Sequence, residues 1–156
     1  MKWLMILLIS CSLTDARAAA TLKYTGEMET IAGAPHNDGV KGQVKVFFDE
    51  MSFTQLVLTT TKPVFGKTEF PSTEQKAFFR EASGVTQLAL VFKLKGPPHK
   101  WYYVYMGETS DQGATYAGKI LKAPNTMDQI GESLAAGNIP QAWSNEGSMS
   151  LKQTAP

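Results

Sequence analysis

The feature that most constrains the fold is a series of short segments in which apolar and polar residues alternate. Residues 22–28 and 44–48 show this most clearly, because nearly every second side chain is apolar and most of the neighbours are polar. A period of two places alternate side chains on opposite faces of a strand. Similar segments, rich in β-branched and aromatic residues, follow at 53–60, 64–70, 87–95, 101–106, 115–122 and around 149–151. Seven to eight short strands at fairly even spacing predict a mainly β domain, a small antiparallel β-barrel or β-sandwich. Pairing of the first and last strands would close it and remove exposed edges.

Two short helices are expected between the predicted strands. The first covers residues 73–82, where Ser72 and Gln75 have the spacing of a capping box. The second begins after Thr126, with Gln129 at the same spacing. In the second segment the apolar residues recur on one helical face. Gly84 follows the first segment and Gly137 follows the second, so both segments carry start and stop signals.

The N-terminal segment, residues 1–18, has the pattern of a secretory signal peptide. Lys2 is followed by an unbroken apolar run over residues 3–9, and residues 16–18 form a small-x-small cleavage site. The apolar run is much shorter than the roughly 20 residues needed to cross a bilayer. We therefore predict export to the periplasm or the extracellular space, with residues 19–156 as a single β-rich domain.

A second route of maturation is open at Cys11. Residues 8–11 resemble a bacterial lipobox, in which the cysteine becomes the lipidated first residue. The alternative function is a structural or protein-interaction module of the bacterial cell envelope, with or without a lipid anchor. Lipidation of Cys11 would favour this alternative and would attach the protein to the membrane. Cleavage after Ala18 would instead remove Cys11, the one cysteine of the chain, and leave a mature domain without disulfides.

The charge of the mature domain argues against nucleic acid as a partner. Removal of residues 1–18 takes Lys2 and Arg17 from the 15 basic residues and Asp15 from the 14 acidic residues, so the remaining chain is formally neutral. Arg80 is its one arginine. A neutral domain lacks the basic field that attracts phosphate backbones, and a lone arginine gives little capacity for phosphate recognition.

Motifs of catalysis and of metal binding are absent from the sequence. No Gly-x-Ser-x-Gly elbow is present, and cleavage at residue 18 leaves no thiol nucleophile. His36 and His99 fall in turn-like segments, so a hydrolase assembled on them is a further alternative with no motif behind it. Two isolated histidines do not make a zinc site, and residues 37–39 are typical of a turn rather than of a calcium loop. The sequence implies no cofactor.

The aromatic run Trp-Tyr-Tyr-Val-Tyr, residues 101–105, is the most unusual segment. Alternation on a strand places Trp101, Tyr103 and Tyr105 on one face, while Tyr102 and its apolar neighbours point the other way. Large side chains on both faces indicate a central strand with one side in the core and the other partly covered. The same pattern is typical of a packed core strand and of an aromatic binding platform.

Phe78 and Phe79 lie on the first predicted helix, and we expect them to cap one end of such a cavity. The leading hypothesis is a non-catalytic exported binding domain that uses the aromatic strand face or a barrel mouth. Its ligand would be a small molecule, a glycan or a protein. The predicted ligand-binding residues are Trp101, Tyr103, Tyr105, Phe78 and Phe79.

Overall fold

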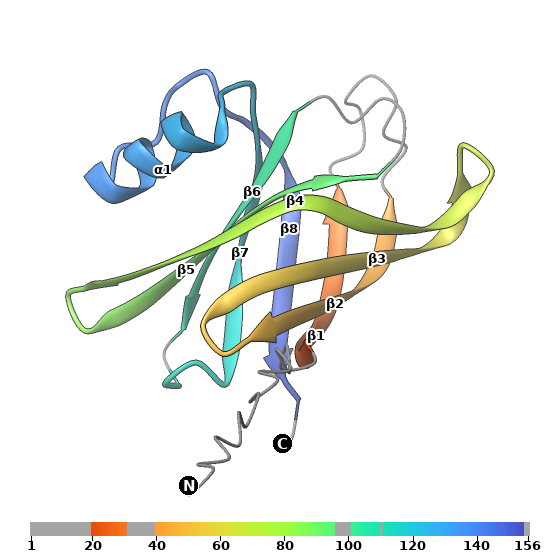
Figure 1. The fold of residues 1–156 in the computed structure, drawn as a ribbon, viewed down its shortest axis with the longest axis horizontal. Coiled ribbons are helices and arrows are strands. Elements are labelled where there is room, and N and C mark those ends of the chain that lie inside the picture. Colours follow the sequence, from red (N-terminus) through yellow and green to blue (C-terminus); the bar gives the residue numbers. More distant parts are fainter. Residues whose placement is uncertain (1–19, 31–39, 96–100, 110, 155–156) are drawn as a thin grey trace, which may run out of the picture.

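The chain forms a closed antiparallel β-barrel with a helix packed on its outer surface (Figure 1). The structure is a computed structural model that describes residues 20–30, 40–95, 101–109 and 111–154. Within these residues the elements are β1 (Thr21–Thr30), β2 (Lys41–Asp49), β3 (Ser52–Val64), β4 (Lys67–Ala82), β5 (Val85–Leu94), β6 (Tyr102–Thr109), β7 (Thr115–Ala123), α1 (Met127–Ala136) and β8 (Ser144–Gln153). The predicted mainly β class is confirmed, as a barrel of eight strands.

Each strand pairs with its neighbour along the chain, and β1 also pairs with β8. In that closing pair Gly26 lies opposite Leu151 and Met28 lies opposite Met149. The expected pairing of the first and last strands is therefore confirmed. Closure removes the open edges on which strands of other molecules can add.

The least regular pairing lies between β3 and β4. It runs from Val57 opposite Pro71 to Val64 opposite Lys67, with an irregularity in between. The first part of β3 and the last part of β4 therefore diverge, and the β4–β5 hairpin extends away from the β2–β3 hairpin (Figure 1). The turn between β3 and β4 is Phe65-Gly66, in which both residues have positive φ, as a two-residue hairpin turn requires. This turn divides the single strand predicted over 64–70.

The first predicted helix is wrong, because residues 73–82 belong to strand β4. Ten residues of β4 pair with β5, as far as Ala82 opposite Val85. Phe78 and Phe79 are consecutive and point to opposite sides of the sheet, which a strand allows. The Ser72 hydroxyl does donate to Gln75 Oε1 over 2.9 Å, and it also accepts from the Leu56 amide at 2.9 Å, so the apparent capping pair joins β3 to β4.

The second predicted helix is confirmed as α1. The Thr126 hydroxyl accepts from the Gln129 amide at 3.3 Å, and the Gln129 side chain accepts from the Thr126 amide at 3.1 Å. This reciprocal pair is a complete capping box. At the other end Gly137 has a φ of 68°, the left-handed conformation in which glycine commonly ends a helix.

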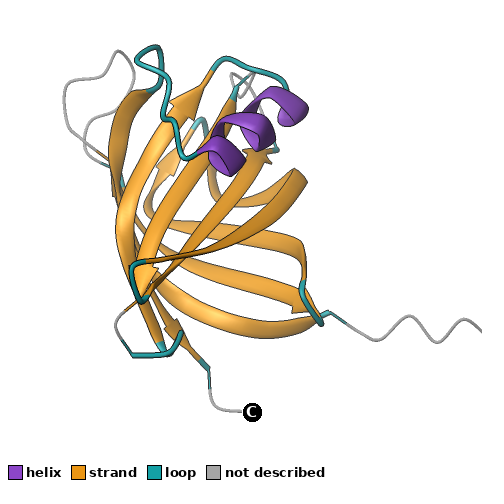
Figure 2. Ribbon diagram, turned by 90° about the vertical axis from the view of Figure 1, so that its left-hand side faces the viewer, coloured by secondary structure: helices purple, strands orange, loops and turns teal. Residues whose placement is uncertain are grey.

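Apolar residues pack in two layers, one inside the barrel and one between its outer face and α1. Figure 2 shows α1 lying on the outside of the barrel. The inner layer includes Leu56, Leu90 and Tyr105, each with no exposed surface. The outer layer joins Ile130 and Leu134 of α1 to buried side chains of neighbouring strands, chiefly Ala89, Val91, Tyr102, Val104, Leu121 and Ala123. Strand β6 contributes to both layers, so the prediction of a central strand covered on both faces is confirmed.

Several sequence predictions fall outside the described residues. They are the signal peptide over residues 1–18, the lipobox with Cys11, and the two turn histidines His36 and His99. Within the described residues, no helix has the length and apolar character needed to cross a membrane.

Candidate functional site in the barrel mouth

One end of the barrel is filled by aromatic rings, and we refer to it as the closed end. Phe48 lies at its centre, with ring centroids 5.7 Å from Phe53, 6.1 Å from Tyr24 and 6.4 Å from Phe79. Tyr116 continues the cluster, 5.8 Å from Tyr24 in an edge-to-face arrangement. Such ring pairs stabilise a core beyond the area they bury. The rings at this end pack against one another, and none of these five lines the cavity at the other end.

The opposite end of the barrel, here called the mouth, contains a cavity of about 70 Å³. Its walls come from the strand ends that barrel closure brings together, and most of the side chains are apolar. They are Met28, Thr30, Val40, Leu58, Thr60, Val64, Phe70, Phe92, Leu94, Tyr103, Ile120 and Glu146. An eight-stranded barrel is just wide enough either to be filled by side chains or to leave room for one small molecule. At this end of the barrel the side chains leave a cavity of about 70 Å³.

The two threonine hydroxyls of the mouth are engaged by backbone groups. Thr60 is buried, and its hydroxyl donates to the Lys62 carbonyl over 2.7 Å. The Thr30 hydroxyl accepts from the Val40 amide at 2.8 Å. An unpaired buried hydroxyl would lower stability, and these bonds satisfy both hydroxyls. Both threonines therefore line the cavity and are not assigned as ligand-binding groups.

Polar character at the mouth is concentrated at Tyr103 and Glu146. The Tyr103 ring stacks on Phe92 with centroids 5.8 Å apart. Burial raises the pKa of the Tyr103 phenol, and the nearby Glu146 carboxylate raises it further, so the phenol keeps its proton at neutral pH. Glu146 accepts a hydrogen bond from the Ser144 hydroxyl over 3.1 Å. The mouth thus combines an apolar wall with a protonated phenol and an acceptor carboxylate.

The five predicted ligand-binding residues do not form one surface. Tyr103 lies in the wall of the mouth cavity. Tyr105 points to the same side of β6 but is fully buried, and its hydroxyl has no hydrogen-bond partner within the described residues. Trp101 precedes β6 and is 37% exposed, with Lys122 Nζ 4.2 Å from its ring centroid. The aromatic run is therefore divided between the mouth, the core and the surface.

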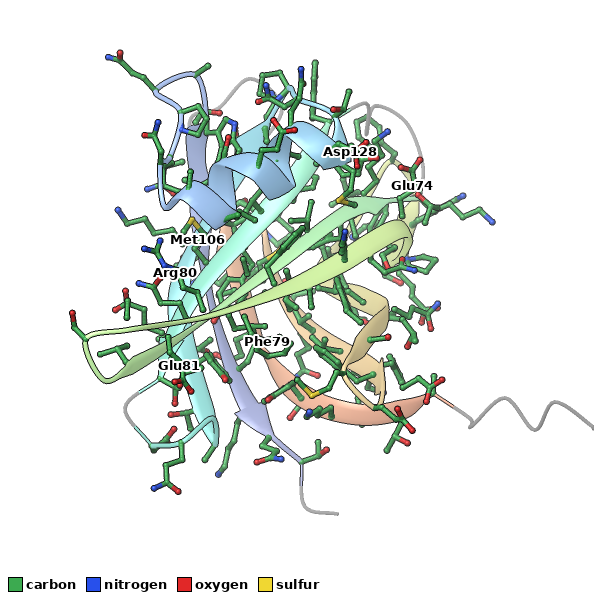
Figure 3. All side chains as sticks on the ribbon, turned by 60° about the vertical axis from the view of Figure 1, so that its left-hand side comes forward. Glu74, Phe79, Arg80, Glu81, Met106 and Asp128 are labelled. Atoms are coloured by element: carbon green, nitrogen blue, oxygen red, sulfur yellow. The ribbon has the colours of Figure 1, made fainter. Side chains whose placement is uncertain are left out.

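Phe78 and Phe79 lie away from the mouth, on the part of β4 that extends towards its hairpin with β5. Phe79 is 41% exposed and contacts Phe48, so it belongs to the closed end (Figure 3). Phe78 packs on the outer face of the barrel against the layer that α1 covers. Their predicted place at the end of a cavity depended on the helix that β4 replaces.

Glu146 is the residue of the mouth that sequence reasoning missed. It lies near the start of β8 in a polar stretch, Ser-Asn-Glu-Gly-Ser, with no apolar alternation to mark its orientation. The position of Glu146 follows from the strand register. Its neighbour Gly147 pairs with Thr30 of β1 and with Ile120 of β7, and both of these residues line the mouth. No local sequence signal identifies this proximity.

Within the described residues, no group of three or more histidine, cysteine or acidic side chains is placed to hold a metal ion. Comparison with known proteins gave no match: no family model fits the chain, and no curated protein or solved structure is significantly similar to it. A function is therefore inferred from the geometry of the mouth.

Proposed function

We propose that this chain is an exported, non-catalytic binding protein that holds a small apolar molecule in the mouth of its β-barrel. The observation that carries the proposal is the apolar cavity at one end of a barrel whose other end is filled by aromatic rings. Ligand sites are commonly concave and apolar, with a few polar groups that fix orientation. The proposed orienting groups are Tyr103 and Glu146.

The size of the cavity limits the ligand. An engineered apolar cavity of roughly 150 Å³ admits benzene, and the mouth cavity of about 70 Å³ is smaller. A short alkyl chain or the edge of a single ring therefore fits, with the remainder of the ligand at the opening. A hydroxyl on the ligand would donate to the Glu146 carboxylate, whereas a purely apolar ligand would leave that acceptor unused.

Phenol and toluene are suitable probes, because they have similar shape and differ in the hydroxyl group. Titration followed by NMR should shift the signals of Met28, Leu58 and Ile120, with phenol bound more tightly than toluene. Val64→Phe, which narrows the mouth, should weaken phenol binding by about tenfold or more, as expected for the loss of one apolar contact region. Val57→Phe is the matched control on the same strand, because Val57 does not line the cavity.

Glu146→Gln tests the orienting group separately from the cavity. The substitution removes the charge and keeps the shape, so it should reduce the preference for phenol over toluene while leaving toluene affinity unchanged. Phenol binding that is equal in the wild type and in Val64→Phe would contradict the proposed site. Binding that shifts the signals of other regions and leaves the mouth unaffected would contradict it as well.

A further inference from the structure

A second hollow lies on the outer face of the barrel, beside the end of α1. This outer groove has a volume of about 1010 Å³, far larger than the mouth cavity. Met106 lies in its floor, Phe78 and Arg80 form the β4 side, and Leu134 and Ile139 form the α1 side. Figure 3 shows Arg80 and Met106 close together below the helix.

The register explains why the groove is apolar with a polar border. One row across four neighbouring strands consists of Phe78, Ala89, Met106 and Lys119. The next row, nearer the strand turns, consists of Arg80, Gln87, Glu108 and Ala117. Helix α1 packs against the first row, where Ala89 is buried and Phe78 and Met106 are partly buried, and it ends at Gly137. The residues of both rows also line the hollow.

Arg80 supplies a cation at the border of the groove. It is exposed, and its guanidinium lies against Gly137, where the carbonyl end of the α1 dipole attracts positive charge. Within the described residues it makes no ion pair. Glu108 is in the same row, two strands away, and its carboxylate accepts from the Gln87 side chain at 2.9 Å. The planar donor set of Arg80 is therefore available to an external anion.

We propose that the outer groove binds a single-chain amphiphile with a carboxylate head group. The carboxylate pairs with Arg80 in the two-pronged geometry that favours arginine over lysine. The chain lies across the row that holds Met106, against Leu134 and Ile139. Three inter-strand steps of about 4.8 Å make that row about 14 Å long, which suits a medium-length acyl chain. The proposal is independent of the function proposed for the mouth.

Dodecanoate, kept below its micelle concentration, is the probe, and dodecyltrimethylammonium has the same chain with the opposite charge. Calorimetry should show tighter binding of dodecanoate, and NMR should place it at Met106, Leu134 and Ile139. Equal affinity for the two amphiphiles would overturn the role of Arg80. Dodecanoate that shifts signals of the mouth and leaves those of the groove unchanged would overturn the site.

Two pairs of variants separate the head group from the chain. Arg80→Gln should weaken dodecanoate by about tenfold, in line with a charge-assisted hydrogen bond. Lys67→Gln removes the same charge at the β3–β4 turn and should have no effect. Ala135→Trp fills the groove and should abolish binding, whereas Ala136→Trp places the same ring on an exposed neighbour that does not line the groove.

The mouth variant Val64→Phe distinguishes this proposal from the function proposed above. It should leave dodecanoate affinity unchanged while it weakens phenol. Circular dichroism confirms that each variant is folded before affinities are compared. Unchanged dodecanoate affinity in both folded Arg80→Gln and folded Ala135→Trp would overturn the proposal.

Discussion

The two ends of the barrel are built from the same strands and differ in what fills them. At the closed end the rings of Phe48, Tyr24 and Tyr116 meet edge to face. At the mouth the inward side chains are mainly aliphatic, such as Leu58 and Met28, and they leave a cavity of about 70 Å³. Both ends are built from the same strands, so the choice of side chains decides which end contains this cavity.

From this difference we expect stability and the proposed binding to depend on opposite ends of the barrel. Interiors are packed as densely as organic crystals, and a void loses the contacts on one of its sides. The closed end gains contacts from every ring, whereas the mouth gives up some of that stabilisation. We expect substitutions at the closed end to change the free energy of unfolding and substitutions at the mouth to change ligand affinity.

The largest effect should come from Phe48→Ala at the closed end. Phe48 is 2% exposed and lies among three aromatic rings, so its removal should lower the free energy of unfolding by about 3–5 kcal/mol. Urea denaturation measures the change. Phe65→Ala removes the same side chain from a turn where it is 64% exposed, and it should cost far less. Similar costs for the two variants would contradict the packing described for the closed end.

A matched pair on β3 compares the packed interior with the mouth. Leu56 and Leu58 both point inward and are 0% and 4% exposed, but of the two Leu58 lines the mouth cavity. Leu→Ala substitutions in cores cost about 2–5 kcal/mol, and the cost grows with the void left behind. Leu58 already borders a void, so Leu56→Ala should be the more destabilising by about 1 kcal/mol or more. Equal losses in urea denaturation would mean that the mouth is packed like the core.

Tyr105→Phe probes the middle of the interior, with a smaller effect of opposite sign. Burial raises the pKa of the Tyr105 phenol, and its hydroxyl has no hydrogen-bond partner within the described residues. Removing an unsatisfied buried hydroxyl relieves a desolvation cost, so stability should stay equal or rise by about 1 kcal/mol. A thermal unfolding scan tests this. A marked loss of stability would show that the hydroxyl makes a bond that this structure does not contain.

The smallest effect concerns acid stability at the β6–β7 turn of the closed end. The Thr109 hydroxyl donates to Asp111 Oδ1 over 2.6 Å, and Thr115 donates through its amide and its hydroxyl. These bonds lower the pKa of Asp111 to about 2, from an ordinary value of 3.8. Because the folded pKa is the lower one, the contribution is complete above the ordinary value and is lost as the pH falls towards about 2. The stability difference between wild type and Asp111→Asn should therefore shrink over that interval. A difference that does not change with pH would contradict this.

Sequence reasoning predicted most of the fold because interior side chains alternate with more exposed ones along strands such as β2 and β8. It was wrong at β4 for a physical reason. Ser72 with Gln75 and Thr126 with Gln129 have identical spacing, but a capping pair forms a helix end when a helical apolar face follows it. That face follows Thr126, with Ile130 and Leu134 buried against the barrel. After Ser72 the side chains instead pack on both sides of a sheet, which favours pairing with β5.

The candidate site was predictable in part. The aromatic run points to Tyr103, but its neighbours at the mouth come from β1, β3, β4, β5, β7 and β8. Their meeting depends on barrel closure and on the register of each hairpin, which local patterns do not specify. The outer groove was beyond reach for the same reason. The sequence marks Arg80 as the one arginine of the predicted mature domain, but no local pattern predicts that it lies beside Gly137 at the end of α1.

Xenon binding under pressure, followed by methyl NMR, tests the contrast between the two ends most directly. Xenon enters apolar cavities and requires no specific hydrogen bond. We predict saturable shifts at Met28, Leu58 and Ile120, which line the mouth, and none at Leu56 and Leu151. Val64→Phe should suppress the mouth shifts. Shifts that appear at the closed end, or a mouth that does not respond to xenon, would contradict the account of the mouth as a ligand cavity.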